Sequence, residues 1–134
     1  MGSKDDEKEE EEEEKGYGGF TPPTSPTDAR TYYHRGNEAY EKGDFDEAIE
    51  NYNMAIVLNP NFSEAYFNRG LGYYNKKDFD RAVEDYDKAA EIDPKNPVVY
   101  NNRGDAYYRK QNFDRAIVDY DKAIALNKRY LKAF

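Results

Sequence analysis

The stretch that decides the fold is ARTYYHRGNEAYEKGDFDEAIENYNMAIVLNPNF, residues 29–62. It recurs without a gap as residues 63–96 and again as residues 97–130, so the chain has a period of 34 residues. The shared columns are Tyr32/Tyr66/Tyr100, Arg35/Arg69/Arg103, Gly36/Gly70/Gly104, Phe45/Phe79/Phe113, Ala48/Ala82/Ala116 and Tyr52/Tyr86/Tyr120. A fixed period between about 20 and 50 residues is the signature of proteins built from stacked repeats.

Each copy is expected to form two helices. In the first copy Tyr32, Gly36 and Ala39 share one helical face. Gly43 can take the left-handed conformation that ends a helix, and Asp44 can cap the next one. This logic predicts six helices, near residues 29–42, 45–58, 63–76, 79–92, 97–110 and 113–126. Ser63 is expected to cap the third helix.

Small residues predict how the helices pack. Gly36, Gly70 and Gly104 fall in mid-helix, where glycine costs about 1 kcal/mol relative to alanine. Three equivalent glycines suggest that another backbone approaches closely at each. One helix pair buries too little apolar surface alone, so the pairs are expected to stack into one continuous core.

The repeat resembles the tetratricopeptide repeat, whose usual signature is Trp-x-x-Leu-Gly-x-x-Tyr followed by Ala, Phe, Ala and Pro. In the second copy the matching residues are Tyr66, Arg69, Gly70, Tyr73, Ala82, Tyr86, Ala89 and Pro94. Tyr replaces the Trp, Arg replaces the Leu, and Lys128 replaces the third Pro. The resemblance implies an all-α solenoid of three stacked helix-turn-helix pairs, wound as a right-handed superhelix over residues 29–134.

The two ends of the chain depart from the repeats. Residues 1–28 are expected to form a disordered acidic tail and a proline-rich linker, because residues 1–15 hold 9 acids and 3 bases. Residues 131–134 begin a fourth copy or extend the last helix. The last apolar face is then uncovered, which predicts either a piece of a longer array or a homodimer through this edge.

Composition excludes several classes of protein. The chain has no cysteine, one histidine (His34) and no run of about 18 apolar residues, so we expect no membrane span, metal site, cofactor or enzyme activity. Residues 16–134 contain 19 acidic and 17 basic residues, so this part of the chain offers no basic stripe for nucleic acid. The default expectation is a cytoplasmic protein.

Function is therefore expected to depend on a surface. In tetratricopeptide domains the first helix of each pair lines a concave groove that holds a peptide or a helix. By resemblance, the expected binding residues are Tyr33, His34, Asn37, Tyr40, Phe67, Asn68, Leu71, Tyr74, Asn75, Asn101, Asn102, Asp105, Tyr108 and Arg109. Asparagine amides suit a ligand's backbone and aromatic rings supply contact area. The tyrosines at 40, 74 and 108 have a second interpretation, which is packing between neighbouring repeats.

These observations predict a non-catalytic protein–protein interaction module, a scaffold or adaptor for a protein or peptide partner. The alternatives are self-assembly through the uncovered C-terminal edge and binding of a basic partner by the acidic tail. The arginine column is interpreted as structural, each guanidinium meeting a carboxylate such as Asp85 or Asp119; an anion-binding ladder is the alternative.

One ligand class can be tested on the sequence. Family members that bind Hsp70 or Hsp90 tails hold a C-terminal carboxylate with Lys, Asn, Asn, Lys and Arg. The matching positions here are Tyr33, Asn37, Asn68, Val98 and Asn102. Because all three cations are missing, binding of such tails is predicted to be weak or absent.

Overall fold

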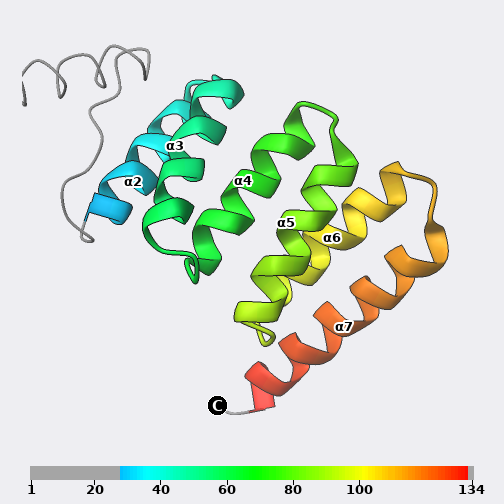
Figure 1. The fold of residues 1–134 in the computed structure, drawn as a ribbon. Helices are drawn as coiled ribbons and strands as arrows, with labels where there is room; N and C mark the ends of the chain where they lie inside the picture. The colour runs from blue at the N-terminus through cyan, green and yellow to red at the C-terminus, as the bar shows by residue number, and fades with distance from the viewer. Residues whose placement is uncertain (1–27, 133–134) are drawn as a thin grey trace, which may run out of the picture.

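The computed structural model describes residues 28–132, and their side chains as far as residue 129. This part of the chain contains helices and no strand (Figure 1). The helices are α2 (Asp28–Glu41), α3 (Phe45–Leu58), α4 (Ser63–Asn75), α5 (Phe79–Ile92), α6 (Pro97–Arg109) and α7 (Phe113–Lys132). The six predicted helices are confirmed to within one residue, except that α7 runs on to Lys132 in the absence of a proline at position 128. The predicted acidic tail and linker, up to residue 27, lie outside the described residues.

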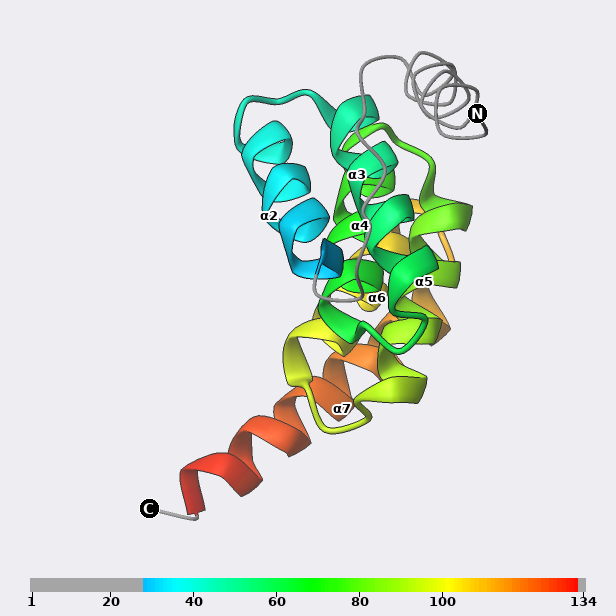
Figure 2. The same ribbon diagram turned by 60° about the vertical axis from the view of Figure 1, so that its left-hand side comes forward.

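The helices stack as successive pairs. Contacts join α2 to α3, α4 to α5 and α6 to α7 within the pairs, and α3 to α4 and α5 to α6 between them. Figures 1 and 2 show the pairs following one another from α2 to α7, with the end of α7 projecting beyond the stack. The predicted all-α solenoid is therefore confirmed.

The glycine column marks close approaches, as predicted, but a backbone atom is among the near neighbours only at Gly104, where the Ala116 carbonyl oxygen would lie 3.2 Å from an added Cβ. A Cβ atom added to Gly36 would lie 2.5 Å from Cε1 of Tyr52, and one added to Gly70 would lie 2.7 Å from Cε1 of Tyr86. The nearest neighbour at both positions is thus a tyrosine ring rather than the backbone of another helix. These rings are almost fully buried, and each fills the space that the missing side chain leaves.

The turn inside each pair repeats one geometry. The second of the three residues between the helices has a positive φ in all three copies: 79° at Gly43, 65° at Lys77 and 64° at Gln111. The side chain that follows the turn caps the second helix, as predicted for Asp44, whose Oδ1 accepts the N–H of Glu47 at 3.2 Å. The turn therefore forms even where the sequence has no glycine to favour the left-handed conformation.

The prediction that Ser63 caps the third helix is wrong. Phe62 is the N-cap residue and makes no side-chain cap, while Ser63 is already helical. The Ser63 hydroxyl donates instead to the carbonyl of Ala89 in α5, at 3.2 Å. Burial of the Phe62 ring, which is 5% exposed, fixes the chain in this register.

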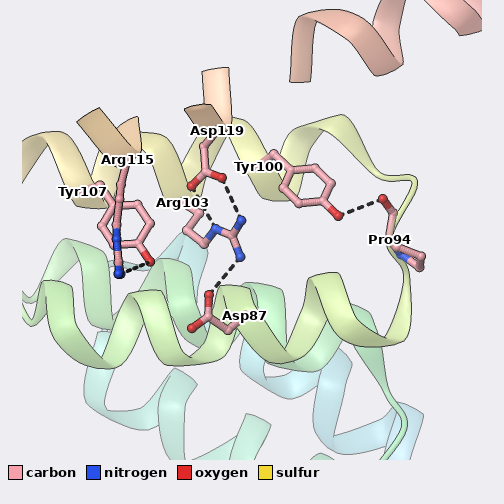
Figure 3. A network of polar contacts seen from close by, with 7 residues as sticks. All are labelled: Asp87, Pro94, Tyr100, Arg103, Tyr107, Arg115 and Asp119. Carbon is pink, nitrogen blue, oxygen red and sulfur yellow. Dashed lines mark hydrogen bonds and ion pairs between the residues drawn. The ribbon is translucent and has the colours of Figure 1, made fainter. Parts of the chain in front are cut away.

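The second and third arginines of the column form a buried ion pair within their own helix pair and a further hydrogen bond to the preceding pair. Arg103 in α6 donates from Nε and Nη2 to the two carboxylate oxygens of Asp119 at 2.8 and 2.7 Å, and from Nη1 to Asp87 in α5 at 2.9 Å (Figure 3). Arg69 likewise donates to Asp85 at 2.9 and 2.6 Å and to Asn53 at 2.9 Å. The structural interpretation of this column is confirmed for both arginines.

Arg35 departs from this arrangement. Its guanidinium lies over the Tyr32 ring, 5.4 Å from the centroid, as Arg103 lies over Tyr100 at 5.3 Å. The position of Asp119, however, is taken by Asn51, whose buried Oδ1 has no hydrogen-bond partner among the described residues. The first pair therefore lacks the carboxylate that the other two pairs use.

Candidate peptide-binding surface

The fourteen predicted binding residues lie on α2, α4 and α6 and form what we call the first-helix face. None of them is buried. Other residues of the same helices, such as Tyr32, Ala65 and Tyr100, carry the core and are at most 3% exposed. The predicted set is therefore on the side of these helices that solvent and a ligand can reach.

An amide–hydroxyl network joins α2 to α4 along this face. Asn68 Nδ2 donates to Tyr33 Oη at 3.1 Å and to Asn37 Oδ1 at 2.9 Å. The same Asn37 oxygen accepts the Tyr52 hydroxyl at 2.6 Å. Burial raises the pKa of Tyr52, so its hydroxyl remains a donor at neutral pH. Asn37 and Asn68 are thus engaged with each other, which leaves their amides less available to a ligand.

A second set of hydrogen bonds links the far ends of the three helices. Asn75 Nδ2 donates to Tyr40 Oη at 2.9 Å, and Arg109 Nε donates to Tyr74 Oη at 3.2 Å. The second bond raises the pKa of Arg109. For Tyr40 and Tyr74 the packing interpretation is therefore supported, whereas Tyr108 is 57% exposed.

The α6 part of the face is the most accessible. Asn101 is exposed and makes no hydrogen bond within residues 28–132. Asn102 Nδ2 turns back to the carbonyl of Val98 at 2.9 Å, and Asp105 accepts the Tyr120 hydroxyl at 2.5 Å. A ligand that reached α6 would meet the Asn101 amide and the Tyr108 ring first.

The remaining members of the face differ in role. His34 is exposed, with its ring 5.5 Å from that of Tyr33. Phe67 packs on Tyr86, with ring centroids 5.6 Å apart. Leu71 takes the column of Asn37, and within residues 28–132 the buried Tyr86 hydroxyl then has no hydrogen-bond partner. The middle pair therefore contributes apolar contact where its neighbours contribute hydrogen bonds.

The sequence did not predict the cavity of about 400 Å³ between α6 and α7. Its lining residues are Pro97, Val98, Asn101, Tyr120, Ala123, Ile124 and Asn127. A signal was present in the repeat alignment, because the column of Asn101 holds Tyr33 and Phe67 in the earlier copies. Those rings pack on the tyrosines equivalent to Tyr120, and the smaller asparagine leaves this space open.

Two further features concern only the part of the chain that the structure describes. It contains no group of three or more His, Cys, Asp or Glu side chains placed to hold a metal ion. No helix between residues 28 and 132 combines the length and the apolar character needed to cross a membrane.

Family models match the chain over the same repeats. A model described as "TPR repeat" matches residues 36–77 and 71–111, and a model described as "Tetratricopeptide repeat" matches residues 97–130. The chain belongs to the tetratricopeptide repeat (TPR) family. TPR domains are protein–protein interaction modules and are generally non-catalytic.

Solved structures of TPR proteins are similar to this chain. A crystal structure of MamA is 30% identical with a TM-score of 0.77, covering 81% of this chain and 63% of the MamA chain. The Arabidopsis OM64 TPR domain is 31% identical with a TM-score of 0.71, covering 73% and 81%. The first TPR of Spaghetti (RPAP3), bound to the HSP90 peptide SRMEEVD, is 26% identical with a TM-score of 0.74, covering 76% and 81%. No curated protein sequence matches this TPR chain.

Proposed function

We propose that this TPR domain is a non-catalytic scaffold or adaptor that binds an extended peptide of a partner protein along the first-helix face. The observation that carries the proposal is the set of hydrogen bonds between α2, α4 and α6, which joins side chains about 35 residues apart into one accessible surface. Because these bonds hold the side chains in place before a ligand arrives, less conformational entropy is lost on binding.

The exposed groups indicate where the ligand makes its contacts. Val98 and Tyr108 are 53% and 57% exposed, and Asn101 lies between them on α6. An asparagine amide can both donate to and accept from a peptide backbone, while Tyr108 supplies apolar area at low entropic cost. We therefore infer a ligand segment with an apolar side chain for Tyr108 and a free backbone for Asn101.

The ligand is inferred to bind through an internal segment rather than a terminal carboxylate. The RPAP3 domain was solved with an HSP90 peptide, but this chain has Tyr33 and Val98 where the carboxylate clamp has lysines. No cation at those positions offsets the desolvation of a carboxylate.

Peptides selected from a random 12-residue library on the full chain test this proposal. The double variant Asn101→Ala/Tyr108→Ala should weaken the selected peptides at least tenfold by calorimetry. The matched control is Val57→Ala, which changes an equally accessible apolar side chain (71% exposed) on α3, away from the face. The proposal is wrong if the double variant binds the peptides as tightly as the control does, or if the selection returns no saturable binder.

A further inference from the structure

A stripe of four side chains on α7 has no partner within the described residues. We call Asp114, Ile117, Asp121 and Ile124 the α7 stripe; their spacing of three and four residues places them on one helical face. All four are exposed, and Ile117 and Ile124 are 57% and 52% exposed. Ile117 lies between the two carboxylates, and Ile124 lies one turn beyond Asp121.

The equivalent stripe on α3 is covered by α4. Asp46 pairs with Lys76, and Asn53 Oδ1 accepts from Arg69 Nη1 at 2.9 Å. Ile49 lies between them, close enough to Gly72 that an added Cβ there would be 3.1 Å from its Cγ1.

The equivalent stripe on α5 is covered by α6 in the same way. Asp80 pairs with Lys110 at 2.6 Å, and Asp87 pairs with Arg103 at 2.9 Å (Figure 3). Val83 and Ala90 are buried in one cluster with Val99 and Ala106 of α6. The junction thus occurs twice in the molecule with the same types of contact.

We propose that the α7 stripe binds an amphipathic helix of a partner protein with the pattern (Ala/Val)-x-x-x-Arg-x-x-(Gly/Ala)-x-x-x-Lys. Helices α4 and α6, each with the C-cap lysine that follows it, carry this pattern, as Ala65-Arg69-Gly72-Lys76 and Val99-Arg103-Ala106-Lys110. In the partner, Arg meets Asp121, Lys meets Asp114, and the small residue between them lies over Ile117. The partner helix runs antiparallel to α7. In both junctions the arginine comes before the lysine in its own helix, but it contacts a residue nearer the C-terminus of the preceding helix than the lysine does.

The cavity beside Ile124 fits the first turn of such a helix. At the first junction the space next to Ile56, the equivalent of Ile124, belongs to a cluster that includes Phe62 and Ala65. These residues lie seven and four positions before Arg69. An apolar residue ahead of the partner's arginine would enter the cavity in the same manner.

A second copy of this chain fits the stripe less well. Its α2 offers Arg35 and Lys42 at the right spacing, but Glu38 falls in the column of Gly72 and Ala106. Ala106 is fully buried, so a carboxylate in that place would be buried against Ile117 without a partner. The chemistry therefore favours a foreign helix with a small residue at this position.

Fluorescence anisotropy of a labelled peptide against the full chain tests the proposal. The probe is a synthetic peptide with the sequence of residues 96–112, NPVVYNNRGDAYYRKQN, which contains the α6 pattern. We expect saturable binding that Asp121→Arg weakens at least tenfold, and that the peptide with Arg103→Asp restores in this variant. The first-helix-face variant Tyr108→Ala, which leaves the lining of the cavity intact, should bind the probe unchanged, which separates this result from the proposed peptide-binding function.

Three outcomes overturn the proposal. The first is the absence of saturable binding of the probe. The second is binding that Asp121→Arg does not weaken, because a probe that only displaced the chain's own α6 would not depend on Asp121. The third is a sedimentation mass that rises with concentration in the wild type and not in Asp121→Arg, which would make a second copy the occupant.

Discussion

The Tyr52 hydroxyl donates to Asn37 at 2.6 Å, whereas the equivalent hydroxyl of Tyr86 is buried with no partner in the part of the chain that the structure describes, because Leu71 replaces the asparagine. Tyr52→Phe should therefore lower the free energy of unfolding by about 1 kcal/mol. Tyr86→Phe should change it by less than about 0.5 kcal/mol, because no hydrogen bond is lost. Urea denaturation of the two variants checks this, and equal losses would mean that Tyr86 has a partner.

Asn51 occupies the position that Asp85 and Asp119 have in the other two repeats. The arginine of the first repeat, Arg35, already lies over the ring of Tyr32. We expect Asn51→Asp to complete the ion pair with Arg35, with a coupling energy of about 1.5–3 kcal/mol. A double-mutant cycle with Arg35→Ala measures this term, since Asn51→Asp alone also loses the bond from Asn51 Nδ2 to the Glu47 carbonyl. Additive effects of the two changes would show that Arg35 does not reach residue 51.

Gly36 is held against the Tyr52 ring at a distance that no Cβ tolerates. Gly36→Ala should destabilise the protein by about 1–3 kcal/mol, although alanine is the better helix former. The matched control is Gly43→Ala, where nothing lies within 4 Å and only the positive φ opposes the change. Thermal unfolding of both variants tests the steric argument, which predicts the larger loss at Gly36.

Burial raises the pKa of Asp85 above its ordinary value of 3.8, and the Arg69 guanidinium offsets only part of this shift. The folded state then holds the Asp85 proton more tightly than the unfolded chain does. This carboxyl therefore contributes stability below the unfolded pKa that is lost as the pH rises through the folded pKa.

We expect the stability of the wild type relative to Asp85→Asn to fall as the pH rises from about 3 to 6. Urea unfolding across that range measures the difference, and carbon NMR of the Asp85 carboxyl gives its midpoint. A midpoint at or below 3.8 would contradict the prediction.

The peptide SRMEEVD should not bind this chain, although the RPAP3 domain was solved with it. Tyr33 and Val98 cannot neutralise a carboxylate, and Asn37 and Asn68 bond to each other. A titration followed by amide NMR should leave the spectrum unmoved at high micromolar peptide. Saturable shifts on α2 and α4 would overturn this expectation and the preference for an internal ligand segment.

The sequence by itself determined the helices and the order in which they stack. The 34-residue period, the turn after Glu41 and the missing proline at 128 are local features, and local backbone preference decides where a helix ends. The arginine–carboxylate pairs were also within reach of the sequence, since Arg69 and Asp85 recur in the third copy as Arg103 and Asp119.

The tertiary structure alone decided which side chains are available. In the sequence, nothing distinguishes Asn37 and Asn68 from Asn101. In the structure, Asn37 and Asn68 are hydrogen-bonded to each other between α2 and α4, whereas Asn101 is exposed to solvent. The α7 stripe likewise resembles in sequence the stripes on α3 and α5 that α4 and α6 cover, but Ile49 and Val83 are buried there and Ile117 is exposed. Exposure depends on which neighbouring helix covers a residue, and no local preference in the chain encodes that contact.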